Sequence, residues 1–225
     1  MLIAEDLPLL VTDGVTGRLL APAITVDIAL GGANMVELTL LGKICLSGAG
    51  YQGKRAIIRD GSPTGDEVLD RAVRTLSAPQ GTRLGAAVRR LGKKLRPDLY
   101  SRLAAAGLVR PEQRRALGVI PVLRWPAQDA RHAAEVRAAV TQALAQQAEP
   151  DARTAALVGL LHALRCEHKA IDPLQLSLPR RQLRARAGQI AASSWANEAA
   201  GGPDGELISA ILAATRSAIL AATSS

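Results

Sequence analysis

The residues of this chain best suited to chemistry are cations gathered in one short segment, residues 83–96, which reads RLGAAVRRLGKKLR. At ~100° per residue, the angle of an α-helix, its apolar residues form one narrow stripe. These residues are Leu84, Val88, Leu91 and Leu95. The basic residues on the opposite side are Arg89, Arg90, Lys93, Lys94 and Arg96. Lys93 and Arg96 would be neighbours on a helix and could hold one phosphate group, because Arg supplies paired hydrogen bonds and Lys a point charge.

The net charge of the chain is concentrated around this segment. Residues 51–125 hold sixteen Lys and Arg against six Asp and Glu, a net of +10 in a chain whose total is +8. Such a charge fits the phosphates of nucleic acid or of anionic lipid. Aromatic residues make up only 2% of the chain, which argues against proteins that stack bases on aromatic platforms. A solvated charged face without a ligand is the alternative to an anion site.

A second segment, residues 117–125, is more apolar than a solvated loop should be. It reads LGVIPVLRW, with β-branched residues around a central proline, and predicts a hairpin or an exposed apolar loop. The side chains that would meet a membrane or a second subunit are Val119, Ile120, Val122, Leu123 and Trp125. A tryptophan ring suits a membrane–water interface. An ordinary hairpin folded on the core is the alternative.

Patterns for catalysis or metal binding are weak. Residues 48–53 fit G-x-G-x-x-G, but a strand is expected after them, so a glycine-rich turn is favoured over a dinucleotide site. His162, Cys166 and His168 have no evident fourth ligand for structural zinc. His162 is therefore expected near the core, and Cys166 as a buried, inert thiol. We expect no catalytic residue, no metal and no cofactor, and we favour a protein that is not an enzyme.

Most of the chain has helical periodicity, and hydrophobic residues make up 48% of it. Predicted helices cover residues 26–41, 83–96, 98–106, a short segment after Pro111, residues 151–164, and the segments after Pro179 and Pro203. Predicted strands cover residues 43–46 and 56–59. Thr64 and Glu67 have the spacing of a capping box at another helix start. Pro97 is expected to interrupt the cationic helix.

The chain shows few signs of an oxidising compartment or a membrane span. Its two cysteines, Cys45 and Cys166, read as reduced thiols of a cytosolic protein. Residues 207–222 are apolar but interrupted by polar residues such as Arg216, which predicts a packed helix. We expect a cytoplasmic protein whose membrane contact would be peripheral.

Four further stretches carry a family pattern. They read ANMVELTLLGKICL, SPTGDEVLD, LAAAGLVRPEQ followed by LGVIPVLRWP, and TAALVGLLHAL. In this order they resemble the Golgi phosphoprotein 3 family, from Glu5 to about Trp195. The resemblance implies a mainly α single domain over residues 1–225, a helical core wrapped by amphipathic helices with one or two short β-hairpins. It also implies a peripheral membrane protein that binds the headgroup of phosphatidylinositol 4-phosphate in a basic pocket and inserts a hydrophobic hairpin.

The resemblance carries the basic pocket over only in part. Two pocket arginines of the family fall on Lys93 and Arg96. A third basic position falls near Gly31 and an aromatic position near Pro22, and neither keeps its chemistry. The resemblance therefore implies binding of anionic lipid in general more than of one phosphoinositide.

The leading hypothesis is a protein that docks on anionic membrane lipid. Lys93 and Arg96 would contact phosphate, and Arg89, Arg90 and Lys94 would add attraction. The hairpin at residues 117–125 would insert into the bilayer or join two copies of the chain.

Two alternatives stay open. Residues 98–125 follow the order helix, turn, short helix and hairpin, which is the outline of a DNA-binding winged helix. An enzyme or a carrier of hydrophobic ligands could also be built on the same fold.

Overall fold

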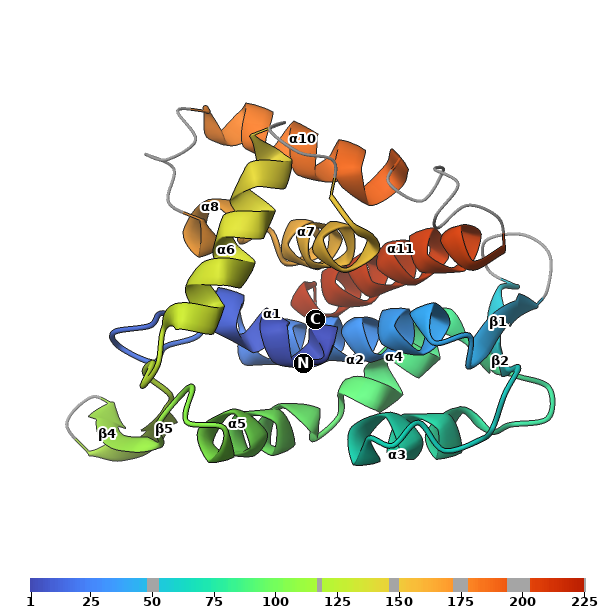
Figure 1. Cartoon of the computed structure of the whole chain (residues 1–225), viewed down its shortest axis with the longest axis horizontal. Coiled ribbons are helices and arrows are strands. Elements are labelled where there is room, and N and C mark those ends of the chain that lie inside the picture. The colour runs from blue at the N-terminus through green and yellow to red at the C-terminus, as the bar shows by residue number, and fades with distance from the viewer. Residues whose placement is uncertain (48–52, 117–118, 146–149, 172–177, 194–202, 225) are drawn as a thin grey trace.

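The long helix α2 (Ala23–Leu40) lies at the centre of the molecule (Figure 1). The computed structural model describes the whole chain except residues 48–52, 117–118, 146–149, 172–177, 194–202 and 225. The neighbours that enclose α2 are α1 (Ile3–Val11), α4 (Leu84–Gly92), α7 (Ala152–Leu164) and α11 (Pro203–Thr223). A helix enclosed in this way is apolar on nearly all sides. Pro22 precedes α2 and Gly42 follows it with φ +66°, which confirms the helix predicted over 26–41.

The other helices form layers on the two sides of α2. In Figure 1, α7, α11 and α10 (Arg180–Ser193) lie above it, and α3 (Glu67–Leu76) and α5 (Leu95–Ala105) lie below it. Helix α6 (Arg131–Leu144) packs against α1 and α7, and the short α8 (Glu167–Ala170) packs against α7 and α10. The mainly α architecture predicted from the sequence is confirmed.

Two helices in the described part of the chain are long and apolar enough to cross a membrane, judged by length and composition alone. One is α2, which is 78% buried inside the protein, and the other is the segment Asp204–Thr223 of α11, which is 56% buried. Helix α11 packs on α2, α4 and α7 and buries Leu207, Ile208 and Ile211. It is therefore the packed helix that its interrupted apolar pattern predicts.

Short antiparallel strands lie at one end of α2. β1 (Ile44–Ser47) pairs with β2 (Arg55–Ile58), and β2 pairs with β3 (Thr82–Arg83). The predicted strands over 43–46 and 56–59 are thus confirmed with a shift of one residue. The glycine-rich turn at residues 48–53 lies, apart from Gly53, outside the described residues.

A second hairpin pairs β4 (Glu112–Ala116) with β5 (Ile120–Arg124). The short helix predicted after Pro111 is wrong, because residues 112–116 form the first strand. The backbone groups of β5 need hydrogen-bond partners, and this strand supplies them. The chain passes from α5 directly into the hairpin, so the outline of a winged helix is wrong as well.

The single cationic helix predicted over 83–96 is also wrong: α4 ends at Gly92 and α5 begins at Leu95. Pro97 explains where the break falls. A helix continuing through Lys93 would bring the carbonyl of that residue against the ring of Pro97 and leave it without an N–H partner. Lys93 is instead extended (φ −64°, ψ 121°), and Lys94 adopts the left-handed region (φ +62°). The predicted apolar stripe is nonetheless buried in full.

Helices α2 and α4 touch backbone to backbone at two glycines. A Cβ placed on Gly31 would lie 1.9 Å from the carbonyl oxygen of Val88, and one on Gly92 would lie 1.9 Å from that of Asp27. Only glycine allows two helix backbones to approach so closely. This contact fixes the depth at which the cationic helix α4 sits against the core.

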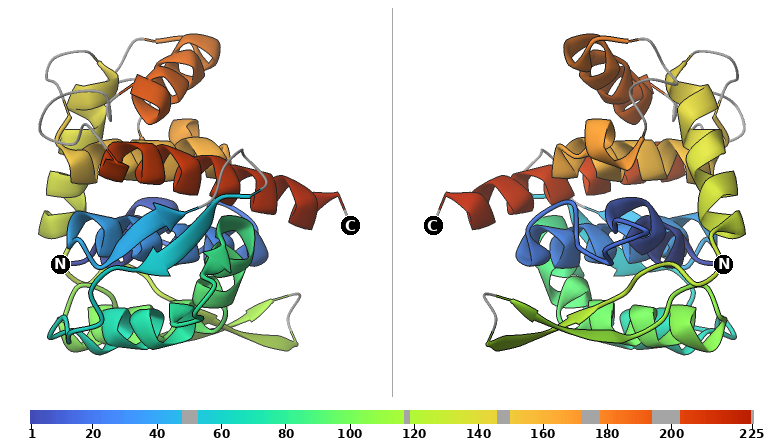
Figure 2. Two further views of the ribbon diagram at one scale, coloured as in Figure 1. Left: turned by 90° about the vertical axis from the view of Figure 1, so that its right-hand side faces the viewer. Right: turned by 90° about the vertical axis from the view of Figure 1, so that its left-hand side faces the viewer.

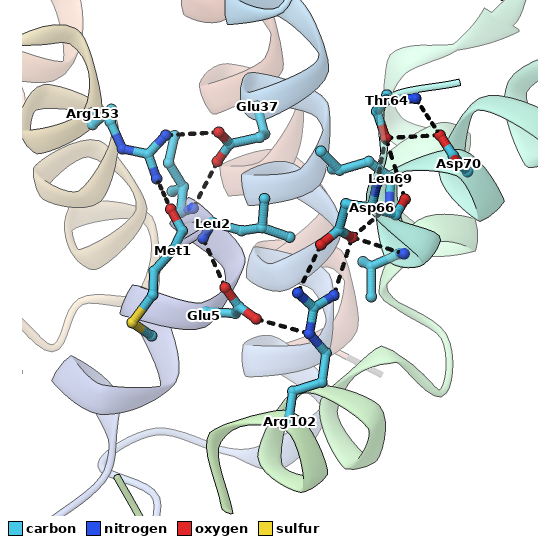
Figure 3. Close-up of polar contacts among 12 residues, drawn as sticks. Met1, Leu2, Glu5, Glu37, Thr64, Asp66, Leu69, Asp70, Arg102 and Arg153 are labelled. Atoms are coloured by element: carbon cyan, nitrogen blue, oxygen red, sulfur yellow. Dashed lines mark hydrogen bonds and ion pairs between the residues drawn. The ribbon is translucent and has the colours of Figure 1, made fainter. Parts of the chain in front are cut away.

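A chain of polar contacts joins the upper and lower layers at the N-terminus (Figure 3). The guanidinium of Arg102 on α5 donates from Nη1 and Nη2 to Asp66 (3.0 and 2.7 Å), and its Nε lies 2.8 Å from Glu5 of α1. Glu5 also accepts from the backbone N–H of Leu2 at 2.8 Å. The hydrogen bonds from Arg102 are the main reason why the pKa of Asp66 is lowered.

Asp66 also starts helix α3. Its carboxylate accepts from the backbone N–H groups of Val68 and Leu69, which makes it the N-cap. The predicted capping box of Thr64 and Glu67 is therefore wrong. Thr64 donates instead to Asp70, from its backbone N–H and from its hydroxyl, both at 2.7 Å.

On the other side of α1, the buried Glu37 of α2 completes the network. Its carboxylate accepts from the backbone N–H of Ile3 and from Nη1 of Arg153 on α7, both at 2.7 Å. Glu37 and Asp66 belong to the stretches ANMVELTLLGKICL and SPTGDEVLD, so these two sequence signatures contribute to one structural network.

Replacing Arg102 tests the network. We expect Arg102→Ala to lower the free energy of unfolding by about 2–3 kcal/mol, because it leaves the buried Glu5 and the partly buried Asp66 without their cation. Arg71→Ala is the matched control, since the ion pair of Arg71 with Asp98 is about half exposed on both sides and should contribute under about 1 kcal/mol. Urea unfolding of both variants measures the difference, and equal losses would contradict the bridging role.

The glycine contact gives a second prediction. We expect Gly31→Ala to lower the free energy of unfolding by about 3 kcal/mol, because its Cβ would overlap the carbonyl of Val88. Gly85→Ala on α4 is the control, since its Cβ would meet only the far end of Arg89 at 3.9 Å. That control should stabilise the protein by roughly 0.5 kcal/mol through helix propensity. Urea unfolding measures both, and a tolerated Gly31→Ala would show that the helices can separate at little cost.

Candidate functional site

The predicted cations divide into two groups. Arg89, Arg90, Lys93 and Lys94 are exposed, and none of them has an ion-pair partner among the described residues. Arg96 is half-buried, and its Nε lies 2.8 Å from Asp27 of α2. The four exposed cations on α4 and at its junction with α5 are called the α4 basic surface below.

The ion pair with Asp27 changes what Arg96 can offer a ligand. A carboxylate at hydrogen-bond distance offsets its charge, and sequence reasoning missed Asp27. The exposed Pro22, at the start of α2, offers no aromatic ring in this region. Gly31, the other departure from the family pattern, faces the backbone of α4 and leaves no room for a side chain.

The break between α4 and α5 separates Lys93 from Arg96. Lys93 lines a small pocket between α2, α3 and α4, with a volume of about 70 Å³, which Arg96 does not line. The residues that line this pocket are Asn34, Arg71, Ala72, Thr75, Arg90, Leu91, Lys93 and Leu95. Lys93 thus lines a pocket together with Arg90 and Arg71, and the pairing of Lys93 with Arg96 on one phosphate stays a prediction.

A larger groove of about 450 Å³ lies between α4 and α11. The groove is lined by the basic residues Lys54, Arg83 and Arg89 and by alanines of α11. Lys54 is paired with Glu206 at 2.7 Å. The groove thus combines basic side chains with an apolar wall, next to the α4 basic surface.

The hairpin presents two apolar side chains to solvent. Val119 is 78% exposed and Leu123 is 51% exposed, whereas Val122 is partly buried. Ile120 lies on β5 opposite Ala116, and Leu117, with which the predicted segment begins, lies outside the described residues. The hairpin also carries arginines on both strands, at positions 114, 115 and 124.

Trp125 anchors the base of the hairpin. Its ring stacks on that of the buried Tyr100 with centroids 5.1 Å apart and an angle of 18° between the planes. The Tyr100 hydroxyl in turn bonds Thr12. Trp125 is therefore held against the protein, whereas Val119 and Leu123 are exposed.

Both views in Figure 2 place the β4–β5 hairpin, α4 and the C-terminal end of α11 on the same side of the molecule. This arrangement is not visible in the sequence, where the hairpin and α4 are separated by the whole of α5. The two elements that carry the exposed cations and the exposed apolar side chains therefore lie on one side of the fold.

The histidine and cysteine residues that were considered as metal ligands or nucleophiles lie mostly in or near the core. Nδ1 of His162 lies at hydrogen-bond distance, 3.0 Å, from Oε1 of Glu167. This is the environment expected of a histidine near the core. Cys166 is 1% exposed, which confirms its predicted burial, and burial raises the pKa of its thiol to about 12, which disfavours the reactive thiolate. Burial lowers the pKa of His168. No group of three or more His, Cys, Asp or Glu suited to a metal ion occurs within the described residues.

Sequence reasoning missed several residues of the small pocket, among them Asn34 and Arg71. Asn34 is the one polar residue in the run ALGGANMV of α2, and a lone amide in a buried helix is a usable signal. Arg71 had no such signal, because its position on α3 suits any solvated side chain.

Comparison with known proteins identifies the family of this chain. No curated protein sequence matches the chain significantly. A family model described as Golgi phosphoprotein 3 (GPP34) matches residues 3–201. That range includes the N-terminal network, the α4 basic surface and the hairpin. The chain therefore belongs to the Golgi phosphoprotein 3 (GPP34) family.

Proposed function

We propose that this protein binds anionic phospholipid at a cytoplasmic membrane surface, through the α4 basic surface and the β4–β5 hairpin. The observation that carries the proposal is that α4, which bears exposed cations without an ion-pair partner among the described residues, and the β4–β5 hairpin, which bears the exposed Val119 and Leu123, lie on one side of the molecule (Figure 2). Membership of the family supports it, since the resemblance implies peripheral membrane binding.

The cations would provide the electrostatic part of the attraction. A basic residue near an anionic leaflet contributes about 1 kcal/mol, so Arg89, Arg90, Lys93 and Lys94 together suffice for weak, reversible docking. The attraction is long-ranged and would weaken with salt. Because these four side chains have no acidic partner in the described part of the chain, docking would not require breaking an ion pair.

The hairpin would provide the second anchor. Stable membrane attachment generally needs two signals, such as a basic patch combined with an inserted apolar group. Val119 and Leu123 would insert at the depth of the lipid headgroups, and Arg114, Arg115 and Arg124 would stay with the phosphates. Self-association through the same hairpin is the competing use of these side chains.

We do not extend the proposal to one phosphoinositide. Arg96 is neutralised by Asp27, Gly31 has no side chain to offer, and Pro22 supplies no ring. The pocket that the resemblance implies for phosphatidylinositol 4-phosphate is thus left with Lys93 alone. General recognition of anionic lipid requires none of the missing groups.

Neutralising the α4 basic surface tests the electrostatic part. We expect Arg89→Ala/Arg90→Ala/Lys93→Ala to weaken co-sedimentation with phosphatidylglycerol vesicles about a hundredfold at low salt, at about 1 kcal/mol for each cation. The control is Arg180→Ala/Arg181→Ala/Arg184→Ala, which removes the same charge from α10 in the opposite layer (Figure 1). Equal losses in the two variants would reject a specific surface. Unchanged vesicle binding with lost, salt-dependent binding to duplex DNA would instead favour nucleic acid.

Charging the hairpin tests the second anchor. We expect Leu123→Asp to weaken vesicle binding about tenfold or more, because a carboxylate would have to enter the headgroup region beside anionic lipid. Gln113→Asp is the control, since Gln113 is exposed and directly opposite Leu123 in the hairpin register, so it adds the same charge without removing apolar surface. A change of molecular mass in solution with unchanged vesicle binding would identify the hairpin as a contact between copies of the chain.

A further inference from the structure

We propose that the cavity between α7, α10 and α11 binds a small carboxylic acid with an apolar chain. The cavity has a volume of about 340 Å³, which lies within the range of roughly 300–1,000 Å³ found for small-molecule sites. It belongs to the upper layer of Figure 1, where these three helices pack on one another. The inference goes beyond the proposed membrane docking and does not rest on it, because the described lining includes no residue of the α4 basic surface or of the hairpin.

Helix α11 separates this cavity from the groove beside α4. Ala210, Ala214 and Ala218 of α11 line that groove, whereas Leu212 and Arg216 of the same helix line the cavity. The two spaces thus lie on different faces of one helix, and a substitution in one of them leaves the lining of the other unchanged.

The wall of the cavity is apolar and consists mainly of small residues. A Cβ placed on Gly159 would lie 2.7 Å from Leu212, so α7 and α11 are in close contact there. Around this contact, short side chains leave a space between the three helices. An apolar wall of this kind favours the hydrocarbon part of a ligand. Apart from Leu212, its apolar members are Gly159, Ala163, Gly188, Ala191, Ala192 and Ala213.

Helices α7 and α11 run in the same direction beside the cavity. Gly159 of α7 lies against Leu212 of α11, and further along both helices Leu160 and Thr215 lie together against Gly32 of α2. The residue numbers therefore increase together along the two helices. This direction determines which polar side chains share an end of the cavity.

The end with the higher residue numbers carries a histidine and an arginine. His162 lies three residues beyond Gly159, and Arg216 lies four residues beyond Leu212, which is about one helical turn in each case. Both side chains line the cavity. They are therefore placed to contact the same group of a ligand.

Arg216 can supply the charge that a carboxylate needs. It is exposed and has no ion-pair partner within the described part of the chain. A guanidinium group matches the two oxygens of a carboxylate through paired hydrogen bonds. One arginine balances a single negative charge, whereas a phosphate monoester carries nearly two. The lining therefore favours a carboxylate over a phosphate group.

His162 presents a second polar atom to the same end. Its Nδ1 lies 3.0 Å from Glu167, whose side chain is only 5% exposed. Its Nε2 has no hydrogen-bond partner among the described residues, and a Cβ placed on Gly188 would lie 3.5 Å from it. Glycine at position 188 thus leaves this edge of the ring uncovered. A protonated imidazole donates from both nitrogens, so Nε2 can donate to a ligand while Nδ1 keeps its contact with Glu167.

The cavity also has room for a chain behind the carboxylate. Ser209 and Arg216 both line it and are seven residues apart, which is about 10 Å along a helix. A carboxylate at Arg216 would direct its chain past Leu212 towards Ser209. A medium-length alkyl chain fits this path.

The first experiment uses octanoate as the probe, below its critical micelle concentration. We expect octanoate to raise the melting temperature of the protein, since a ligand of the folded state stabilises it. Acetate, which lacks the chain, and 1-octanol, which lacks the charge, should have little effect at equal concentration. Arg216→Ala should weaken octanoate binding about tenfold or more, as expected for a hydrogen bond to a charged group. Arg184→Ala is the matched control, because Arg184 is an exposed arginine of α10 outside the lining.

The second experiment fills the cavity without removing a contact. In Gly188→Ala, the added methyl group would be in ordinary van der Waals contact with His162 and would cover Nε2. We expect octanoate binding to fall about tenfold, while urea unfolding shows a stability equal to or above that of the wild type, because alanine favours a helix more than glycine does. Gly85→Ala is the control, since it adds the same methyl group to the groove between α4 and α11.

The third experiment locates the ligand by NMR. The chain has three histidines, and His132→Gln and His168→Gln identify the imidazole signals of the two that do not line the cavity. We expect octanoate to shift the signal of His162 and to leave that of His132 in place.

Several results would overturn the inference. They are an unchanged His162 signal at high octanoate, equal binding of octanoate and 1-octanol, equal losses in Arg216→Ala and Arg184→Ala, and a loss in Gly85→Ala instead of Gly188→Ala. The last result would place octanoate in the groove beside α4.

Discussion

The bridge that Arg102 makes between Glu5 and Asp66 is the contact on which the lower half of the molecule depends. Asp66 starts α3, Arg102 lies on α5, and Glu5 belongs to α1, so one guanidinium ties three helices together. Helix α4 lies between α3 and α5 in the chain. The glycine contact seats α4 on α2, and the Arg102 bridge ties together the helices on either side of α4 in the chain. A structural ion-pair network thus lies beside the α4 basic surface.

The basic residues around the α4–α5 junction differ in whether an acidic partner offsets their charge. Residues 93 and 96 would share one helix face if the helix were continuous, but Pro97 breaks it and turns the two side chains to different neighbours. Arg96 meets Asp27, whereas Lys93 meets Arg90 and Arg71. Pro97 therefore divides the predicted cationic face. Arg96 forms an ion pair, Arg90 and Lys93 line a small pocket, and Arg89 and Lys94 are exposed to solvent. The proposed attraction to anionic surfaces uses only the exposed cations, so it does not depend on the pairing of residues 93 and 96.

The sequence predicted the elements whose signals are local and failed where distant contacts decide. The helices over residues 26–41 and 151–164 and the apolar stripe of residues 84–95 depend on signals within one or two helical turns, and each was confirmed. The strand at residues 112–116 was missed because its partner β5 determines it. Asp27 and Arg71 were missed because their importance arises only when α2 and α3 meet α4. The hairpin and α4 lie on the same side of the molecule because of the direction in which α5 runs between them. No local sequence pattern predicts that direction.

The backbone contact at Gly31 also constrains how this protein can change. A side chain at that position would meet the backbone carbonyl of Val88, so it could be accommodated only if α4 moved away from α2. Because the obstacle is backbone, changing the side chain at position 88 would not relieve it. The packing of α4 on α2 therefore limits which side chains α2 can offer beside α4, and a change in one of them would reach into the interior of the protein.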